Sequence, residues 1–142
     1  MKKVNILIAL FAIAILSVSC ESYDDYDTNR KNIVGFSALI LEINNIPEGG
    51  ERSRTVNLFM SDIFDEEKTF NIVAVPNLQD PATNPENYSF DTTVTFPPNT
   101  RQATITVTGI DNSIEGEEYF ALAIQGEADV VSGGIVSVRV RN

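Results

Sequence analysis

Histidine and tryptophan are absent from the 142-residue sequence, and cysteine occurs only once. The absence of histidine excludes Ser-His and Cys-His catalysis, histidine-ligated zinc and histidine proton shuttles. A single cysteine can form neither an internal disulfide nor a thiolate cluster. The length fits one ordinary domain, so the sequence describes a small acidic domain with few routes to catalysis.

The N-terminal residues have the pattern of an export signal. Lys2 and Lys3 precede an apolar stretch from Val4 to Leu16, and small residues then lead to Cys20. The stretch is too short, and wrongly flanked, for a stable membrane span. It resembles a bacterial lipoprotein signal, which implies removal of residues 1–19 and lipidation of Cys20. The alternative is an ordinary signal peptide that is cut near Cys20 and leaves a free thiol.

An acidic segment, residues 20–31, follows the signal. Four of the seven residues after Cys20 are acidic and none is aliphatic, so we expect an extended tether. Acidic residues at this place also resemble the surface-export signal of lipoproteins in Bacteroidetes-type bacteria. That resemblance implies an outer-membrane lipoprotein at the cell surface, and a plain solvated linker is the alternative.

The net charge limits the partners. Removing residues 1–19 takes away two of the ten basic residues and no acidic one, which leaves eight against twenty and a net charge of −12. The electrostatic field of this negative charge repels nucleic acid and anionic lipid head groups. We therefore expect no nucleic-acid partner, and membrane contact through the lipid anchor alone.

The remainder, residues 32–142, has a hydrophobic period of two rather than 3.6. Ala103, Ile105 and Val107 alternate with threonines, as a half-buried strand requires. Similar alternation predicts one continuous strand over 34–40, and seven strands in all. The pattern predicts an all-β fold: a single immunoglobulin-like Greek-key β-sandwich. The expected core comprises Phe36, Ile40, Val56, Leu58, Phe70, Ile72, Phe90, Phe96, Ile105, Val107, Phe120, Leu122, Val136 and Val138.

Residues 88–124 resemble a Calx-beta domain. The shared features are a Tyr-led strand (Tyr-Ser-Phe at 88–90), a Thr-Phe-Pro turn at 95–97 and the alternating threonine strand. An acidic loop with Glu-Gly-Glu-Glu at 115–118 then precedes an aromatic strand. The resemblance implies a seven-stranded sandwich and, in some members, calcium sites in the loops at one end, with roles in adhesion or calcium regulation.

Matching the family's acidic loop residue by residue implies Asp111, Glu115 and Glu118 as Ca²⁺ ligands. Calcium takes six to eight oxygen ligands, several of them carboxylates, so the residue types suit it. Two departures from the family oppose the assignment: the usual run of Asp at the loop start is shortened, and the chain ends with Arg139 and Arg141 instead of an acidic cluster. The alternative is an acidic, solvated loop whose Glu118 only flanks a strand.

Clustered carboxylates can also serve a glycosidase when a cleft separates them suitably. Here they occupy one loop, with no aromatic platform beyond Tyr119, so we expect no enzyme. The interpretation is a lipid-anchored, surface-exposed envelope protein with a binding, adhesion or accessory role toward an envelope protein or glycan. The alternative is a structural subunit that holds a protein partner by sheet-edge contacts, without metal.

Overall fold

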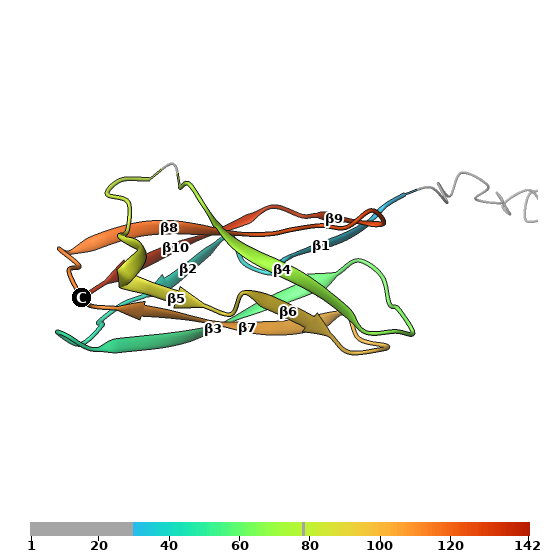
Figure 1. Cartoon of the computed structure of the whole chain (residues 1–142), viewed down its shortest axis with the longest axis horizontal. Coiled ribbons are helices and arrows are strands. Elements are labelled where there is room, and N and C mark those ends of the chain that lie inside the picture. The colour runs from blue at the N-terminus through green and yellow to red at the C-terminus, as the bar shows by residue number, and fades with distance from the viewer. Residues whose placement is uncertain (1–29, 78) are drawn as a thin grey trace, which may run out of the picture. The chain divides into compact units, whose positions relative to one another are not determined.

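The computed structural model describes residues 30–77 and 79–142 (Figure 1). The expected signal peptide and Cys20 lie outside these residues, as does most of the expected tether. Residues 31–142 form one compact unit. Its elements are β1 (Asn32–Phe36), β2 (Ile40–Ile43), β3 (Glu51–Met60), β4 (Lys68–Val75), the 3₁₀ turn η1 (Pro85–Asn87), β5 (Tyr88–Phe90), β6 (Thr93–Phe96), β7 (Gln102–Ile110), β8 (Glu117–Ile124), β9 (Val130–Ser132) and β10 (Ile135–Arg141). No helix in the described part of the chain is long and apolar enough to span a membrane.

The strands form two five-stranded sheets that pack as a sandwich (Figure 1). The β7 sheet has the order β5-β7-β3-β1-β9, and the β8 sheet has the order β2-β10-β8-β4-β6. Most neighbours are antiparallel, whereas the first and last segments pair in parallel, β1 with β9 and β2 with β10. The predicted all-β sandwich is confirmed.

The described residues contain ten strands rather than the expected seven, because three extended segments cross between the sheets. The pairs β1/β2, β5/β6 and β9/β10 each place one half in the β7 sheet and the other half in the β8 sheet. The pair β1/β2 had been expected as a single strand over 34–40. Strands on both sides of a crossing alternate with the same period of two, so alternation alone does not reveal which sheet each half joins.

The first crossing corrects the expected strand over 34–40. Ser37 N donates to Asn57 O in the β7 sheet, while Leu39 O accepts from Ser137 N in the β8 sheet. The inward phase therefore changes at Ala38. Ile43 becomes buried, whereas Ile40, which was expected in the core, is exposed.

Glycine permits the matching crossing near the C-terminus. A Cβ on Gly133 would lie 2.8 Å from Ile33 Cγ2 and 3.1 Å from Val34 O, so β1 can approach only a residue without a side chain. The next residue, Gly134, has a φ of 121°, which L-residues with side chains rarely adopt. These two glycines let the last strand follow the first from one sheet to the other.

The core lies between the sheets, as the alternation predicts. Val107, Leu122 and Val138 are fully buried, and Phe70 packs edge-on against Phe96 with ring centroids 6.0 Å apart. Apart from Ile40, the expected core is buried or, for Phe36 and Phe90, half-buried against it. The buried apolar residues that were not expected are Val34, Ile43, Ile46, Met60, Val94, Ile114, Ala121, Ile124, Val130 and Val140.

Candidate functional site

The expected calcium loop, residues 111–116, lies at one end of the sandwich beside the β2–β3 turn and the C-terminus (Figure 1). Asp111 joins the loop to that turn. Its Oδ2 accepts from Gly49 N at 3.3 Å, its Oδ1 accepts from Ile114 N at 3.2 Å, and its own N–H donates to Gly50 O. Both carboxylate oxygens of Asp111 therefore accept backbone hydrogen bonds.

Glu118 is the second residue of β8 and is almost fully buried. Its Oε1 accepts from Glu115 N at 3.4 Å, and its Oε2 accepts from Asn87 Nδ2 at 3.2 Å. The Asn87 side chain is itself fully buried, and its Oδ1 accepts from both the N–H and the hydroxyl of Ser113. Asn87 and Glu118 thus hold the loop closed through hydrogen bonds, and sequence analysis missed the part played by Asn87.

The structure does not gather Asp111, Glu115 and Glu118 around one point. The described residues contain no group of three acidic, histidine or cysteine side chains placed to hold a metal. Asp111 and Glu118 already accept N–H donors, while the Glu115 side chain is exposed. The C-terminal end lies close by, since Asn142 Nδ2 donates to Ile114 O. Calcium binding remains a prediction from the family resemblance, and in this structure hydrogen bonds close the loop.

We therefore expect the melting temperature to be insensitive to Ca²⁺ at about millimolar concentration. A site with a dissociation constant of about 10⁻⁴–10⁻³ M would raise the melting temperature by a few degrees.

Asn87→Ala should lower the free energy of unfolding by about 1–3 kcal/mol with or without Ca²⁺, because it leaves buried polar groups unpaired. Thermal melts with Ca²⁺ and with a chelator check both points. If Ca²⁺ raises the melting temperature of the wild type and Asp111→Ala removes that rise, the loop binds calcium and the expectation above is wrong.

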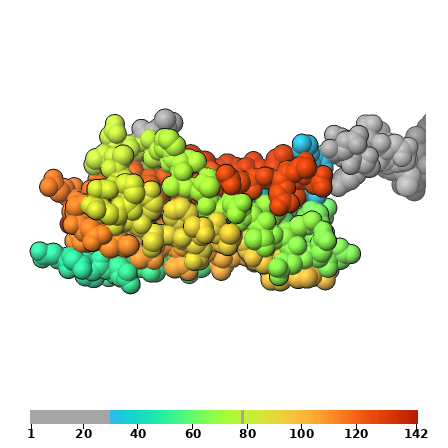
Figure 2. All heavy atoms as spheres, in the orientation of Figure 1, coloured from blue at the N-terminus to red at the C-terminus, as the bar shows by residue number. Residues whose placement is uncertain are grey.

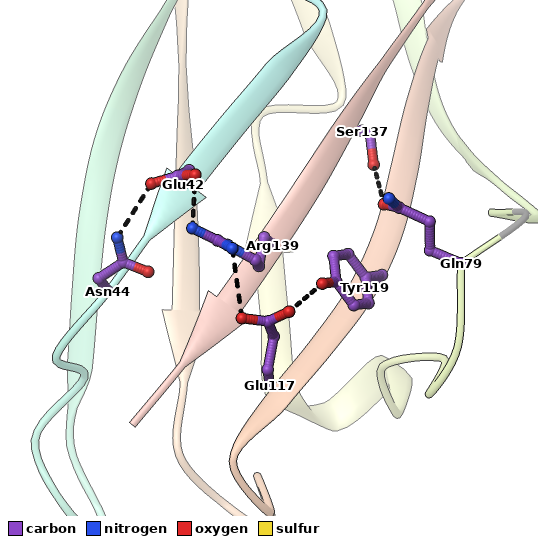
Figure 3. A network of polar contacts seen from close by, with 7 residues as sticks. All are labelled: Glu42, Asn44, Gln79, Glu117, Tyr119, Ser137 and Arg139. Atoms are coloured by element: carbon purple, nitrogen blue, oxygen red, sulfur yellow. Dashed lines mark hydrogen bonds and ion pairs between the residues drawn. The ribbon is translucent and has the colours of Figure 1, made fainter.

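A second cluster of polar side chains lies on the outward face of the β8 sheet (Figure 3). Arg139 on β10 stands between two carboxylates: its Nη2 lies 2.5 Å from Glu42 Oε1 and its Nη1 lies 3.3 Å from Glu117 Oε2. The Tyr119 hydroxyl donates a hydrogen bond to Glu117 Oε1. Asn44 Nδ2 donates to Glu42 Oε2 at 3.2 Å. We call these five residues the outward network.

Strand register assembles the outward network. Arg139 is the cross-strand partner of both Tyr119 on β8 and Glu42 on β2. The neighbours Val138 and Val140 point into the core, so alternation sends the Arg139 side chain outward. Ser137 continues the row, where its hydroxyl donates to Gln79 Oε1 and accepts from Asn77 Nδ2. Polar side chains from three strands and one loop therefore share one surface.

Hydrogen bonds set the charge states within the network. The bond from Asn44, followed by that from Arg139, holds the pKa of the Glu42 carboxyl below its usual range. The bond to Glu117 raises the pKa of the Tyr119 phenol, so this side chain is neutral at pH 7. The hydrogen bond to Glu42 raises the pKa of the Arg139 guanidinium. By formal charge, two carboxylates and one guanidinium give the network a net charge of −1.

The outward face of the β8 sheet also carries polar atoms without partners in the described part of the chain and exposed apolar side chains. Asn44 Oδ1 and Arg139 Nε are buried and have no hydrogen-bond partner among the described residues. Beside the network, Ile40 and Ile135 are 60% and 47% exposed. Alternation places both on the same outward face, because Ile40 is opposite Ser137 and Ile135 lies two residues before it. Exposed aliphatic side chains beside a polar cluster are typical of interaction surfaces.

Sequence analysis did not identify the outward network. Alternation could have placed Glu117, Tyr119 and Arg139 on the outward phase of their strands, because each lies next to a buried residue. It could not pair them, because the register between β8 and β10 and the parallel pairing of β2 with β10 are long-range properties. Glu42 and Arg139 are separated by 97 positions in the chain.

No protein-family model and no curated protein sequence matches the chain. Among solved structures, a candidate carbohydrate-binding protein from Bacteroides ovatus superposes with a TM-score of 0.63 at 8% identity, covering 77% of this chain and 36% of its own. A two-domain protein of unknown function from Bacteroides fragilis gives a TM-score of 0.62 at 10% identity, covering 78% of this chain and 45% of its own. The Calx-beta structure CBD12 from CALX1.2 gives 0.58 at 12% identity, covering 77% and 44%.

These likenesses concern the fold. The Calx-beta structure among them confirms the architecture that the motifs of residues 88–124 implied. The chain spans less than half the length of each of the three proteins. In each of them, this sandwich is therefore one part of a longer polypeptide.

Proposed function

We propose that this chain is a lipid-anchored protein of the bacterial envelope, exposed at the cell surface, that serves as a non-catalytic binding module of a larger assembly. Its binding surface is the outward face of the β8 sheet. The observation that carries the proposal is the outward network, which joins β2, β10 and β8 on one surface beside the exposed side chains of Ile40 and Ile135.

The anchoring part of the proposal is supported by the sequence. The apolar stretch before Cys20 and the acidic residues after it resemble the signals of surface lipoproteins. A lone cysteine is otherwise a reactive liability in an exported protein. Lipidation also suits a strongly acidic chain, because its charge opposes adsorption to anionic membranes.

The binding part is supported by the fold and by the chemistry of the face. Solved Bacteroides proteins with this fold include one described as a candidate carbohydrate-binding protein. The sandwich is a fraction of each of those chains, which suits an accessory module. A polar cluster beside exposed Ile40 and Ile135 provides both directional and apolar contacts for a partner.

A second candidate function is partner binding by strand addition at β2. This strand ends the β8 sheet and pairs with β10 on one side only. Leu39, directly before it, is 82% exposed, and Ile40 at its start is also exposed. An unpaired, apolar sheet edge is a template for a strand of another chain.

Affinity purification tests the function. Tagged wild type is captured after membrane-impermeant cross-linking of intact cells, in parallel with Ile135→Lys on the face, Leu39→Lys at the edge and Thr104→Lys as control. Thr104 is exposed on the opposite sheet, so the control adds the same charge far from the proposed surface. We expect one partner with wild type and the control, and its loss with Ile135→Lys. Loss only with Leu39→Lys would favour the edge, and equal capture by every variant would contradict both candidates.

A further inference from the structure

A pocket of about 240 Å³ lies where β4 separates from β8. The two strands pair as far as Val75, and the chain turns away at Pro76. Residues 81–83 return to β8 farther along: Thr83 N donates to Tyr119 O, and Tyr119 N donates to Pro81 O. In Figure 2 this yellow-green segment lies against the orange residues of β8. The pocket lies between the end of β4 and residues 81–83, which both pair with β8.

The lining combines aromatic and polar groups and contains no charged side chain. Tyr88 and Phe120, whose rings stack with centroids 3.9 Å apart, form the aromatic wall of the pocket, and Tyr119 lies next to Phe120 in β8. The volume is below the roughly 300–1,000 Å³ of pockets for drug-sized ligands, so it suits a group the size of one ring. The lining residues are Ala74, Val75, Pro76, Asn77, Ala82, Thr83, Tyr88, Tyr119 and Phe120.

The polar side chains of the lining differ in whether they have hydrogen-bond partners. Asn77 Nδ2 donates to Phe120 O at 3.1 Å, which replaces the ladder bond that β4 no longer provides. Thr83 is 8% exposed, and its Oγ1 is buried with no hydrogen-bond partner among the described residues. A buried hydroxyl without a partner is costly. Thr83 lines the pocket, so a ligand bound there would lie next to this residue.

We propose that this pocket binds one ring of a neutral carbohydrate, an inference that rests on the proposed binding function and specifies its ligand. A sugar ring has an apolar face, which suits the aromatic wall, and hydroxyls that can reach a threonine. An aliphatic side chain of a peptide would leave Thr83 Oγ1 unpaired. An anionic sugar would meet no basic group in the lining, and the whole chain carries a net charge of −10.

The test is an NMR titration of the chain from residue 20 onward, carrying Cys20→Ala so that no lipid is attached. The probes are glucose, galactose, mannose and N-acetylglucosamine, with glucuronic acid as the charged comparison. We expect at least one neutral sugar to shift the amide signals of Ala82, Thr83 and Tyr119, with a dissociation constant on the order of millimolar, as one ring-sized ligand allows. Glucuronic acid should leave these signals unchanged.

Two variants separate binding from folding. Thr83→Val removes the unpaired hydroxyl at nearly constant shape, so the melting temperature should stay equal or rise while affinity falls roughly tenfold. Ala82→Leu fills the pocket from an exposed position and should abolish binding. Thr104→Val, on the exposed face of the opposite sheet, is the matched control and should bind as wild type does.

The pocket proposal is overturned if no neutral sugar shifts the pocket signals, or if Thr83→Val binds as tightly as wild type. Shifts spread over the β7 sheet would overturn it as well. The proposed function has a separate readout, because partner capture is judged with Ile135→Lys, which does not line the pocket. If partner capture depends on Ile135 but no sugar binds to the pocket, the proposed function is supported and only the carbohydrate proposal is wrong.

Discussion

Val107→Asp unfolds the sandwich. Val107 lies in the middle of β7 with no exposed surface, and it faces the core between the two sheets. A carboxylate there has no cationic partner, so it is either buried as a charge or protonated at a cost. We expect a loss of more than about 4 kcal/mol, comparable to the whole stability of many domains. Circular dichroism and a thermal melt of the purified variant measure the loss.

The control is Thr104→Asp on the same strand. Thr104 faces solvent opposite Asn57 on β3, so the same carboxylate remains hydrated. We expect a change of no more than about 0.5 kcal/mol, as for most surface substitutions. Comparable destabilisation by both variants would mean that the inward and outward phases of β7 have been assigned wrongly.

Cys20→Ala should release the protein from the membrane fraction or leave it unprocessed. The proposed lipid is attached to this residue, and acyl chains contribute about 0.8 kcal/mol for each buried CH₂ group. The described residues contain no helix that could span a membrane in its place. Fractionation of cells, combined with metabolic labelling by a fatty acid, measures both the anchor and its loss.

The matched variant for this experiment is Ser19→Ala, which changes the neighbouring residue and keeps a small side chain before the cysteine. It should be labelled and membrane-bound like wild type. If Cys20→Ala still sediments with the outer membrane after washing in high salt, the lipoprotein interpretation is wrong or the assembly itself retains the protein.

The strands and most of the core could be predicted from the sequence because sandwich strands alternate on a local scale. Ile105 and Val107 are buried and Thr104 and Thr106 are exposed, as a period of two requires. The Calx-beta-like motifs reached the same fold through the turns that separate these strands. Local chemistry therefore determines where the strands run and which face of each strand is buried.

The sheet crossings and the surfaces could not be predicted in this way, because they depend on pairing between distant segments. Ile40 was expected in the core, and its exposure follows from the crossing near Ala38, where the inward phase of the chain changes. Asn87 reaches Glu118 across 31 positions of sequence. The acidic loop looked like a metal site because composition counts carboxylates and does not show which N–H groups they accept.

The pocket illustrates the same limit. Tyr119 was the one aromatic side chain recognised near the acidic loop, and it was judged insufficient as a platform for a sugar. Folding brings Tyr88 and Phe120 to the same pocket wall, and it places Thr83 there through a bond to Tyr119 O. Tyr88 and Phe120 are far apart in sequence, so the sequence alone does not show that their rings stack in the folded protein.

Site-specific photo-cross-linking in living cells tests the central claim, that the outward face of the β8 sheet is the binding surface, most directly. A photoreactive amino acid replaces Ile135 on that face in one strain and Thr104 on the outward face of the β7 sheet in another. Both side chains are exposed, so both variants should fold and reach the same location. The account predicts a defined adduct from position 135 and none from position 104. Adducts from position 104 alone would contradict it.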